Sequence, residues 1–152
     1  KEILCKSRNL IELKQDILKM REKMLDVHPN PTPLFDIKHD RGGIIDVEFI
    51  VQYLVLGYAS QFPQLTGNIG NIALLKLAGE LGLVPAELAT QVRTAYREYR
   101  RLQHRFRLGG EPELTSAPLS KDKSEKFARI AADHLSNDRL SVLQLWDAVF
   151  RL

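Results

Sequence analysis

Charged residues and a glycine pair gather in one segment, Lys38 to Phe49, which reads Lys-His-Asp-Arg-Gly-Gly-Ile-Ile-Asp-Val-Glu-Phe. The glycines allow a tight turn with bare backbone N–H groups, and the apolar run that follows predicts a helix with partial positive charge at its N-terminus. Such an arrangement can bind an anion, to which Lys38 and Arg41 would add full positive charge. The expected site therefore consists of Lys38, Arg41, Gly42, Gly43, Asp46 and Glu48.

The two carboxylates of this segment, Asp46 and Glu48, require compensation by a metal ion or by basic side chains. On a strand they would share one face and could chelate an ion, but two residues along a helix differ by about 200° of rotation. Only one of them can then face a ligand, and Asp46, nearest the glycines, is the better candidate, whereas Glu48 aligns with Gln52. The structural alternative is that Asp46 complements the helix N-terminus, stabilising it by about 0.3–1 kcal/mol.

The composition predicts one domain, residues 1–152, because 152 residues suffice for one core but not for two. Hydrophobic residues make up 44% and charged residues 27%, and no stretch approaches the roughly 20 apolar residues of a membrane helix. With one Cys and four His lacking ligand spacing, we expect no disulfide, no metal site and a reducing, cytoplasmic location. The chain opens at Lys1 within helical sequence, so we interpret it as a fragment of a longer protein.

Apolar periodicity predicts an all-α fold, an up-and-down bundle of about five to six helices. Residues 1–27 hold a long first helix over Ile3–Leu25, and residues 28–43 form a linker and motif loop with a short extended piece over Leu34–Lys38. The remaining helices lie in residues 44–152, and the first of them is a buried central helix over Ile44–Ala59. The next helix is capped by Thr66 or Asn68 and ends near Leu81, before Gly82, and the one after it has Pro85 near its start and reaches Phe106. Two shorter helices follow, over Lys121–Leu135 and Asp138–Phe150. In the last helix the inward residues are expected to be Leu140, Leu143, Trp146, Val149 and Phe150.

The fourth predicted helix separates an apolar stripe from a basic one. The inward stripe is Leu88, Val92, Ala95, Tyr99, Leu102 and Phe106, and the basic face beside it is Arg93, Arg97, Arg101 and Arg105. Arginine forks suit phosphate, nucleic acid or an acidic protein surface, although a solvated face is the commoner role of such a run. The interleaved aromatic residues lie at core spacing, so we do not expect nucleic-acid binding.

Other reactive residue types do not form a recognisable catalytic motif. Cys5, His134 and Trp146 lie at or near core spacing, where packing is the default role. No P-loop, nucleophile elbow or helical metal motif occurs. Independent catalysis by this chain is therefore not expected.

The segment Phe35 to Tyr53, with Lys-His-Asp-Arg-Gly-Gly and Asp-Val-Glu-Phe at its centre, resembles the bifunctional glutamine synthetase adenylyltransferase/adenylyl-removing enzymes, and their C-terminal half in particular. The related PII uridylyltransferases carry a similar pattern of Lys, Gly-Gly and Asp. Supporting stretches are Met20–Met24, Thr66–Asn68 and Leu74-Leu75, so the resemblance covers essentially the whole chain.

The resemblance implies a helical bundle that follows a nucleotidyltransferase palm similar to that of DNA polymerase β. In that family the C-terminal half transfers AMP from ATP, with Mg²⁺, to a tyrosine of glutamine synthetase, and the N-terminal half removes it by phosphorolysis under control of glutamine and the PII protein. The palm motif, Gly-Ser followed by Asp-x-Asp, is absent from these residues. The resemblance thus places the catalytic residues upstream and none in this chain.

Within that framework the charged segment would face the triphosphate of ATP beside the palm. Lys38 and Arg41 would offset phosphate charge, the N–H groups of Gly42 and Gly43 would bind an oxygen, and Asp46 would orient Lys38 or Arg41 or touch Mg²⁺ through water. In the alternative, the bundle is a regulatory docking module. The face formed by Arg93, Arg97, Arg101 and Arg105 would then bind glutamine synthetase, the PII protein or the other half of the enzyme.

Overall fold

The computed structural model describes residues 10–67, 69–107, 129–130 and 135–151, with only the backbone described at 106, 107, 129 and 130. In these residues the chain is all-α apart from one pair of two-residue strands. The helices are α2 (Leu10–Val27), α3 (Ile44–Tyr58), α4 (Asn71–Glu80), α5 (Ala86–Arg107) and α6 (Ser136–Phe150), with a 3₁₀ turn, η1, at Pro63–Thr66. The predicted all-α bundle is confirmed.

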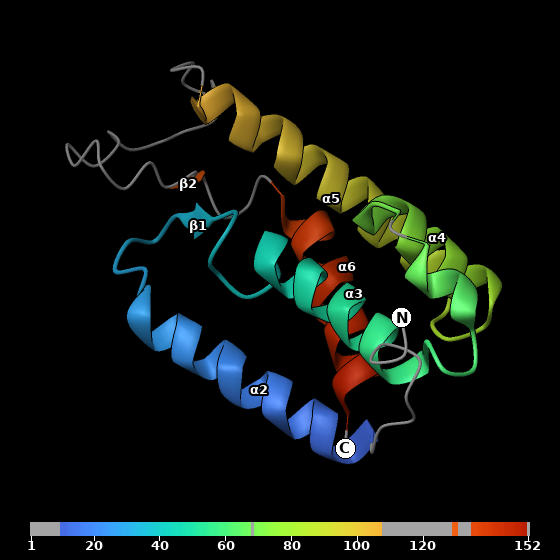
Figure 1. Ribbon diagram of the computed structural model, residues 1–152. Coiled ribbons are helices and arrows are strands. Elements are labelled where there is room, and N and C mark those ends of the chain that lie inside the picture. The colour runs from blue at the N-terminus through green and yellow to red at the C-terminus, as the bar shows by residue number, and fades with distance from the viewer. Residues whose placement is uncertain (1–9, 68, 108–128, 131–134, 152) are drawn as a thin grey trace.

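Helix α3 lies at the centre of this bundle and contacts α2, α4, α5 and α6 (Figure 1). Its side chains are buried on nearly every side, among them Ile44, Val47, Ile50 and Leu54. A helix that is apolar all round is stable in water only when other elements cover all of it. The predicted central helix is thus confirmed, and it ends at Tyr58, a few residues before Pro63.

Helix α2 buries one narrow face. Leu13, Ile17 and Arg21 recur every four residues and are its buried residues. The helix ends at Val27, just before His28 and the prolines, as the missing proline N–H groups require. The part of the predicted first helix that precedes Leu10 lies outside the described residues.

Helix α4 begins later than predicted. Thr66 belongs to η1, where its hydroxyl donates to the carbonyl of Pro63 at 2.7 Å, and Gly70 is the N-cap of α4 without a side-chain cap. Thr66 therefore does not cap this helix, and Asn68 lies outside the described residues. Its predicted end is confirmed, since α4 stops at Glu80 and Gly82 follows at φ +76°.

Helix α5 carries the predicted inward stripe. Val92, Ala95, Tyr99 and Leu102 are all at most 1% exposed, and Leu88 is half-buried against the core. The helix starts at Ala86, directly after Pro85. The side chain of Phe106 lies outside the described residues.

The predicted helix over Lys121–Leu135 is wrong where the structure describes it. Arg129 and Ile130 form a strand, β2 (Arg129–Ile130), which pairs antiparallel with β1 (Phe35–Asp36) in the predicted extended piece. The pairing partner lies far away in the sequence, so local periodicity could not reveal it. Leu135 is the N-cap of α6, and residues 121–128 and 131–134 lie outside the described residues.

Helix α6 begins at Ser136 and buries Trp146, Val149 and Phe150 as predicted. Leu140 was expected to face inward, but it is 52% exposed, whereas Val142 and Leu145 are fully buried. The inward face of α6 is thus rotated relative to the predicted one. Cys5 and His134 lie outside the described residues, and none of the described helices is long and apolar enough to cross a membrane.

Candidate functional site: the motif loop and the arginine face

The motif loop, Phe35–Gly43, is tied to the bundle by the buried carboxylate of Asp46 in the first turn of α3. Its Oδ1 accepts a hydrogen bond from Arg21 Nε at 2.5 Å, and its Oδ2 accepts one from the N–H of Gly42 at 2.7 Å. Arg41 Nε lies 3.5 Å from the same Oδ2, as a second ion pair. Arg21 is 1% and Asp46 0% exposed, so solvent does not reach this ion pair. Asp46 therefore contacts Arg41, but its principal cation is Arg21 of α2.

Three helices each donate one hydrogen bond to a backbone carbonyl of the motif loop. Arg21 of α2 donates from Nη2 to the oxygen of His39 at 2.8 Å. Tyr99 of α5 donates its hydroxyl to the oxygen of Gly42 at 2.8 Å, and Arg139 of α6 donates from Nε to the oxygen of Arg41 at 2.9 Å. Burial, with the nearby carboxylate of Asp138, raises the pKa of Tyr99, so its hydroxyl keeps the donated proton. The loop is therefore held from three sides.

The glycine pair serves close packing. Gly42 has φ +85°, a left-handed conformation, and a Cβ there would lie 2.6 Å from Cγ of Arg139. A Cβ on Gly43 would collide with the carbonyl oxygen of Ile37. The N–H of Gly42 is donated to Asp46 and that of Gly43 to the oxygen of Asp40 at 3.0 Å. Both N–H groups that were expected to bind an anion are thus engaged within the chain, which argues against a backbone anion cradle.

Two further carboxylates shape the loop from inside. Asp36 Oδ1 accepts the N–H groups of Lys38 and His39, both at 3.0 Å, and its Oδ2 lies 3.2 Å from Nδ1 of His39. Burial alone would raise the pKa of Asp36, but the hydrogen bonds and charge of His39 and the N–H of Lys38 outweigh it and lower that pKa. Asp40 Oδ2 accepts from Asn30 at 2.8 Å and from the N–H of Asp36 at 3.0 Å. The acidic residues of the loop therefore have structural partners.

The remaining charges of the expected site face outward. Lys38 and Glu48 are exposed, and the side chain of Arg41 is 42% exposed with its guanidinium 4.9 Å above the ring of Trp146. Nε of Arg41 is itself buried and makes no hydrogen bond with the described residues. Lys38 and Arg41 are thus the cations of the motif that a ligand can reach.

The described residues do not fit a magnesium site at Asp46. Its two oxygens accept from a guanidinium and a backbone N–H, both of which a cation would have to displace. Within the described parts of the chain no group of three His, Cys, Asp or Glu residues could hold a metal ion. A direct contact of Asp46 with Mg²⁺ is therefore unsupported, and the expected contact through water stays a prediction.

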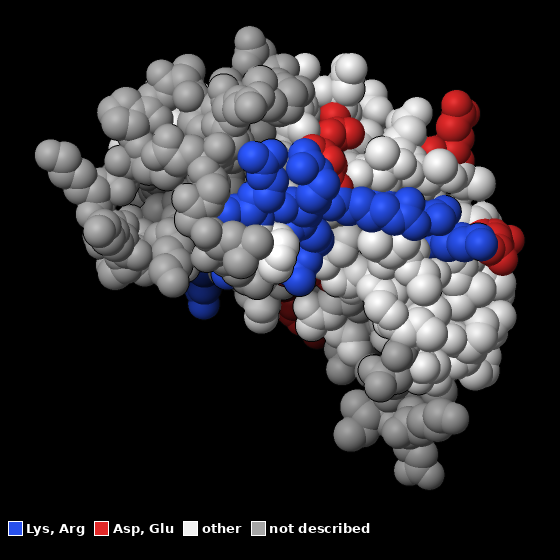
Figure 2. All heavy atoms as spheres, turned by 90° about the horizontal axis from the view of Figure 1, so that it is seen from above, with Lys and Arg blue, Asp and Glu red and all other residues white. Residues whose placement is uncertain are grey.

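The second candidate surface is the arginine face of α5, which Figure 2 shows as a band of basic side chains with acidic ones at its edges. Arg97, Arg101 and Arg105 are exposed, as the sequence predicts. Arg93 is half-buried, and its Nε is enclosed without a hydrogen-bond partner among the described residues. Arg101 pairs with Glu98 through Nε at 3.0 Å and Nη2 at 2.5 Å. The accessible charge is thus concentrated toward the C-terminal part of α5.

Sequence reasoning missed the three side chains that hold the loop, Arg21, Tyr99 and Arg139. Arg21 gave a usable signal, because it continues the four-residue spacing of Leu13 and Ile17 into the core. An arginine at such a position requires a buried carboxylate. Tyr99 lies in the predicted core stripe, and nothing in the sequence indicated that its hydroxyl donates to the carbonyl oxygen of Gly42.

The model of the family described as GlnD PII-uridylyltransferase matches residues 12–151, nearly the whole chain. The chain belongs to this family. Among curated proteins, the bifunctional glutamine synthetase adenylyltransferase/adenylyl-removing enzyme of Nitrosomonas europaea is 68% identical over 99% of this chain, and that of Nitrosomonas eutropha is 65% identical over 99%. The enzyme of that name from Aromatoleum aromaticum is 47% identical over 98%.

This member of the PII-uridylyltransferase family spans only a small part of those relatives. It covers 16% of the length of each Nitrosomonas protein and 14% of the Aromatoleum protein. The expected resemblance to glutamine synthetase adenylyltransferases is confirmed for the sequence of this domain.

Proposed function

We propose that this chain is the helical part of an enzyme that adenylylates a tyrosine of glutamine synthetase with ATP and so regulates nitrogen assimilation. The support is its 68% identity to a relative that bears the adenylyltransferase name. In this role a palm elsewhere in the polypeptide supplies the catalytic residues and binds Mg²⁺. The present domain positions the nucleotide beside that palm.

The observation that carries this proposal is the fixed motif loop with two outward cations. Hydrogen bonds from α2, α5 and α6 hold its backbone, so Lys38 and Arg41 start from a defined position. A cation that is already positioned loses little entropy when a phosphate arrives, which favours stabilisation of charge in the transition state. The loop thus acts through side chains, because its glycine N–H groups are engaged.

The test uses the full-length enzyme with Lys38→Ala and Arg41→Met, measuring turnover and the Michaelis constant for ATP. Methionine keeps an unbranched apolar chain over Trp146 while removing the charge. We expect each variant to lose at least about tenfold in kcat/KM, the cost of one charge-assisted hydrogen bond. Lys76→Ala, an exposed lysine of α4, is the matched control. Unchanged kinetics in folded Lys38 and Arg41 variants would make the loop purely structural.

A second candidate function, protein docking, is favoured by the exposed guanidinium groups of Arg97, Arg101 and Arg105. In this proposal the arginine face binds an acidic surface of glutamine synthetase or of the PII protein. Arg97→Glu with Arg105→Glu should weaken binding of that partner, with a strong salt dependence, and leave the affinity for ATP unchanged. Partner binding that is insensitive to both substitutions and to salt would reject docking through this face.

A further inference from the structure

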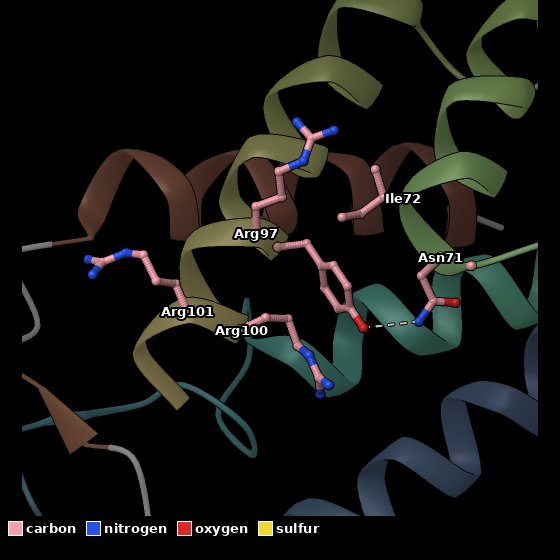
Figure 3. A pocket seen from close by; sticks show the side chains of 7 residues that line it. Asn71, Ile72, Arg97, Arg100 and Arg101 are labelled. Carbon is pink, nitrogen blue, oxygen red and sulfur yellow. Dashed lines mark hydrogen bonds between the residues drawn. The ribbon is translucent and has the colours of Figure 1, made fainter. Parts of the chain in front are cut away.

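A cavity of about 590 Å³ lies where the N-terminus of α4 meets the middle of α5 (Figure 3). Its lining comprises Gly70, Asn71, Ile72, Tyr96, Arg97, Arg100 and Arg101. Its volume falls within the usual range for small-molecule sites, but the cavity is shallow and wide open to solvent. Neither the motif loop nor the proposed nucleotide role involves these residues, whereas Arg97 and Arg101 also belong to the arginine face.

The surface of this cavity is mostly apolar, with one hydrogen bond that joins its two helices. Tyr96 is 7% exposed, and its hydroxyl oxygen accepts a hydrogen bond from Nδ2 of Asn71 at 3.1 Å, drawn dashed in Figure 3. For the hydroxyl hydrogen itself, no acceptor occurs among the residues that the structure describes. A buried phenol of this kind normally finds an acceptor. An anion in the cavity would supply one.

The rim is cationic. Figure 3 shows Arg97, Arg100 and Arg101 leaving α5 in different directions, with Arg100 lying below Asn71 and Arg101 pointing away from Asn71 and Ile72. Arg101 is paired with Glu98 and Arg100 donates to Gln103 at 3.1 Å, whereas Arg97 has no polar partner within the described residues. Among the described residues, no carboxylate lines the cavity. After Glu98 neutralises one arginine, two positive charges remain.

The first turn of α4 adds donors on the opposite wall. Gly70 is its N-cap and lacks a side-chain cap, so the N–H groups of Asn71 and Ile72 have no acceptor within the helix. The partial positive charge of the helix N-terminus therefore has the same sign as that of the arginine rim. Ile72 and the ring of Tyr96 provide apolar surface beside these donors.

We propose that this cavity binds a small phosphate monoester. A phosphate monoester carries about −1.5 to −2 charge at pH 7, which matches the two uncompensated arginines. Its oxygens fit guanidinium forks, helix N–H groups and the phenolic hydroxyl. The cavity is larger than a phosphate ion alone, so the organic group of the ester lies against Ile72 and the ring of Tyr96.

The test is calorimetric titration of the 152-residue chain at low salt with phenyl phosphate and with inorganic phosphate. We expect saturable one-to-one binding of phenyl phosphate that is tighter than that of inorganic phosphate. Arg97→Ala with Arg100→Ala should weaken it at least about tenfold, the cost of losing charge-assisted bonds. The matched control is Arg105→Ala, an exposed arginine of the same face that does not line the cavity, which should change the affinity less than twofold.

Equal weakening by Arg105→Ala would overturn the proposal, because it would show diffuse attraction to the whole face. Equal affinity for the two probes, or binding that does not saturate, would also overturn the proposal. In that case an anion at this surface would be an adventitious ion only. Phenyl succinate, a dicarboxylate of similar size, tests the source of the anion, and binding as tight as that of phenyl phosphate would refute phosphate selectivity. If the double alanine variant fails to fold, Arg97→Lys with Arg100→Lys keeps the charge but removes the forks, and retained full affinity would reject the site.

Discussion

The motif loop and the arginine face of α5 both carry dense charge, but they use it in opposite ways. Asp36 and Asp40 of the loop, and Asp46 beside it in α3, all accept hydrogen bonds from the chain itself, and the Arg21–Asp46 pair is fully buried. On the arginine face the guanidinium groups of Arg97 and Arg105 are exposed. The segment whose residue types suggest a binding site thus uses most of its charged groups in contacts within the chain. The arginine run, for which a solvated role is the commoner expectation, keeps its charges accessible to a partner.

The largest effect that separates the two regions should come from Asp46→Ala. Removing this carboxylate leaves Arg21 buried and uncompensated, so the free energy of unfolding should fall by about 3–5 kcal/mol. Urea denaturation measures it, with Asp16→Ala, an exposed acid of α2, as the control. Replacing both partners, Arg21→Leu with Asp46→Leu, should cost clearly less than the sum of the single changes. A loss below about 1 kcal/mol for Asp46→Ala would contradict the contrast between the regions.

Tyr99→Phe should have the next largest effect. It removes the hydroxyl that satisfies the buried carbonyl of Gly42, which should cost about 1–3 kcal/mol in the free energy of unfolding. Tyr96→Phe, three residues earlier on the same helix, is the matched comparison, because its partner Asn71 is only half-buried and can turn to water. Equal losses in thermal or urea unfolding would mean that the hydroxyl of Tyr99 does not hold the loop.

A smaller effect should be visible as a pH dependence of stability. The native pKa of Asp36 lies below its ordinary value of 3.8, so the ionised form stabilises the fold above that pH. This stabilisation should be lost as the pH falls through the native pKa of Asp36. The difference in unfolding free energy between the wild type and Asp36→Asn should therefore shrink below about pH 4. A difference that stays constant from pH 7 to pH 3 would exclude this linkage.

The smallest effect should come from the arginine face. Arg105→Ala removes an exposed side chain, so the free energy of unfolding should change by no more than about 0.5 kcal/mol. A circular-dichroism melt beside that of Asp46→Ala gives the sharpest contrast between a structural charge and an accessible one. Destabilisation comparable to that of Tyr99→Phe would show that this face too serves the fold.

Local patterns predicted what depends on local spacing. The buried helix α3 and the stripe of Val92, Ala95 and Tyr99 follow from periodicity, because a helix repeats its faces along the chain. The strand pairing at Arg129 could not be predicted in this way. Periodicity places Arg21 in the core but does not identify Asp46 as its partner, because both pairings depend on contacts between distant segments.

The expected site was affected by the same limitation. The residue types in the segment from Lys38 to Glu48 suggested a bound ligand. The sequence alone could not show that Asp46 and Asp40 accept the hydrogen bonds of the Gly42 and Gly43 N–H groups in the folded chain. The rotated face of α6 has a different cause. Leu140 is as apolar as Leu145, and only the position of the neighbouring helices decides which of them is covered.

The bond from Arg139 to the carbonyl of Arg41 spans 98 residues, and that from Tyr99 to Gly42 spans 57. During synthesis the segment at residue 41 therefore leaves the ribosome long before the side chains that fasten it. Contacts of such separation form late, because the intervening chain must first be ordered. The loop should consequently be among the last parts of the domain to gain protection from hydrogen exchange during refolding, and a nascent chain that stops before α6 should lack it.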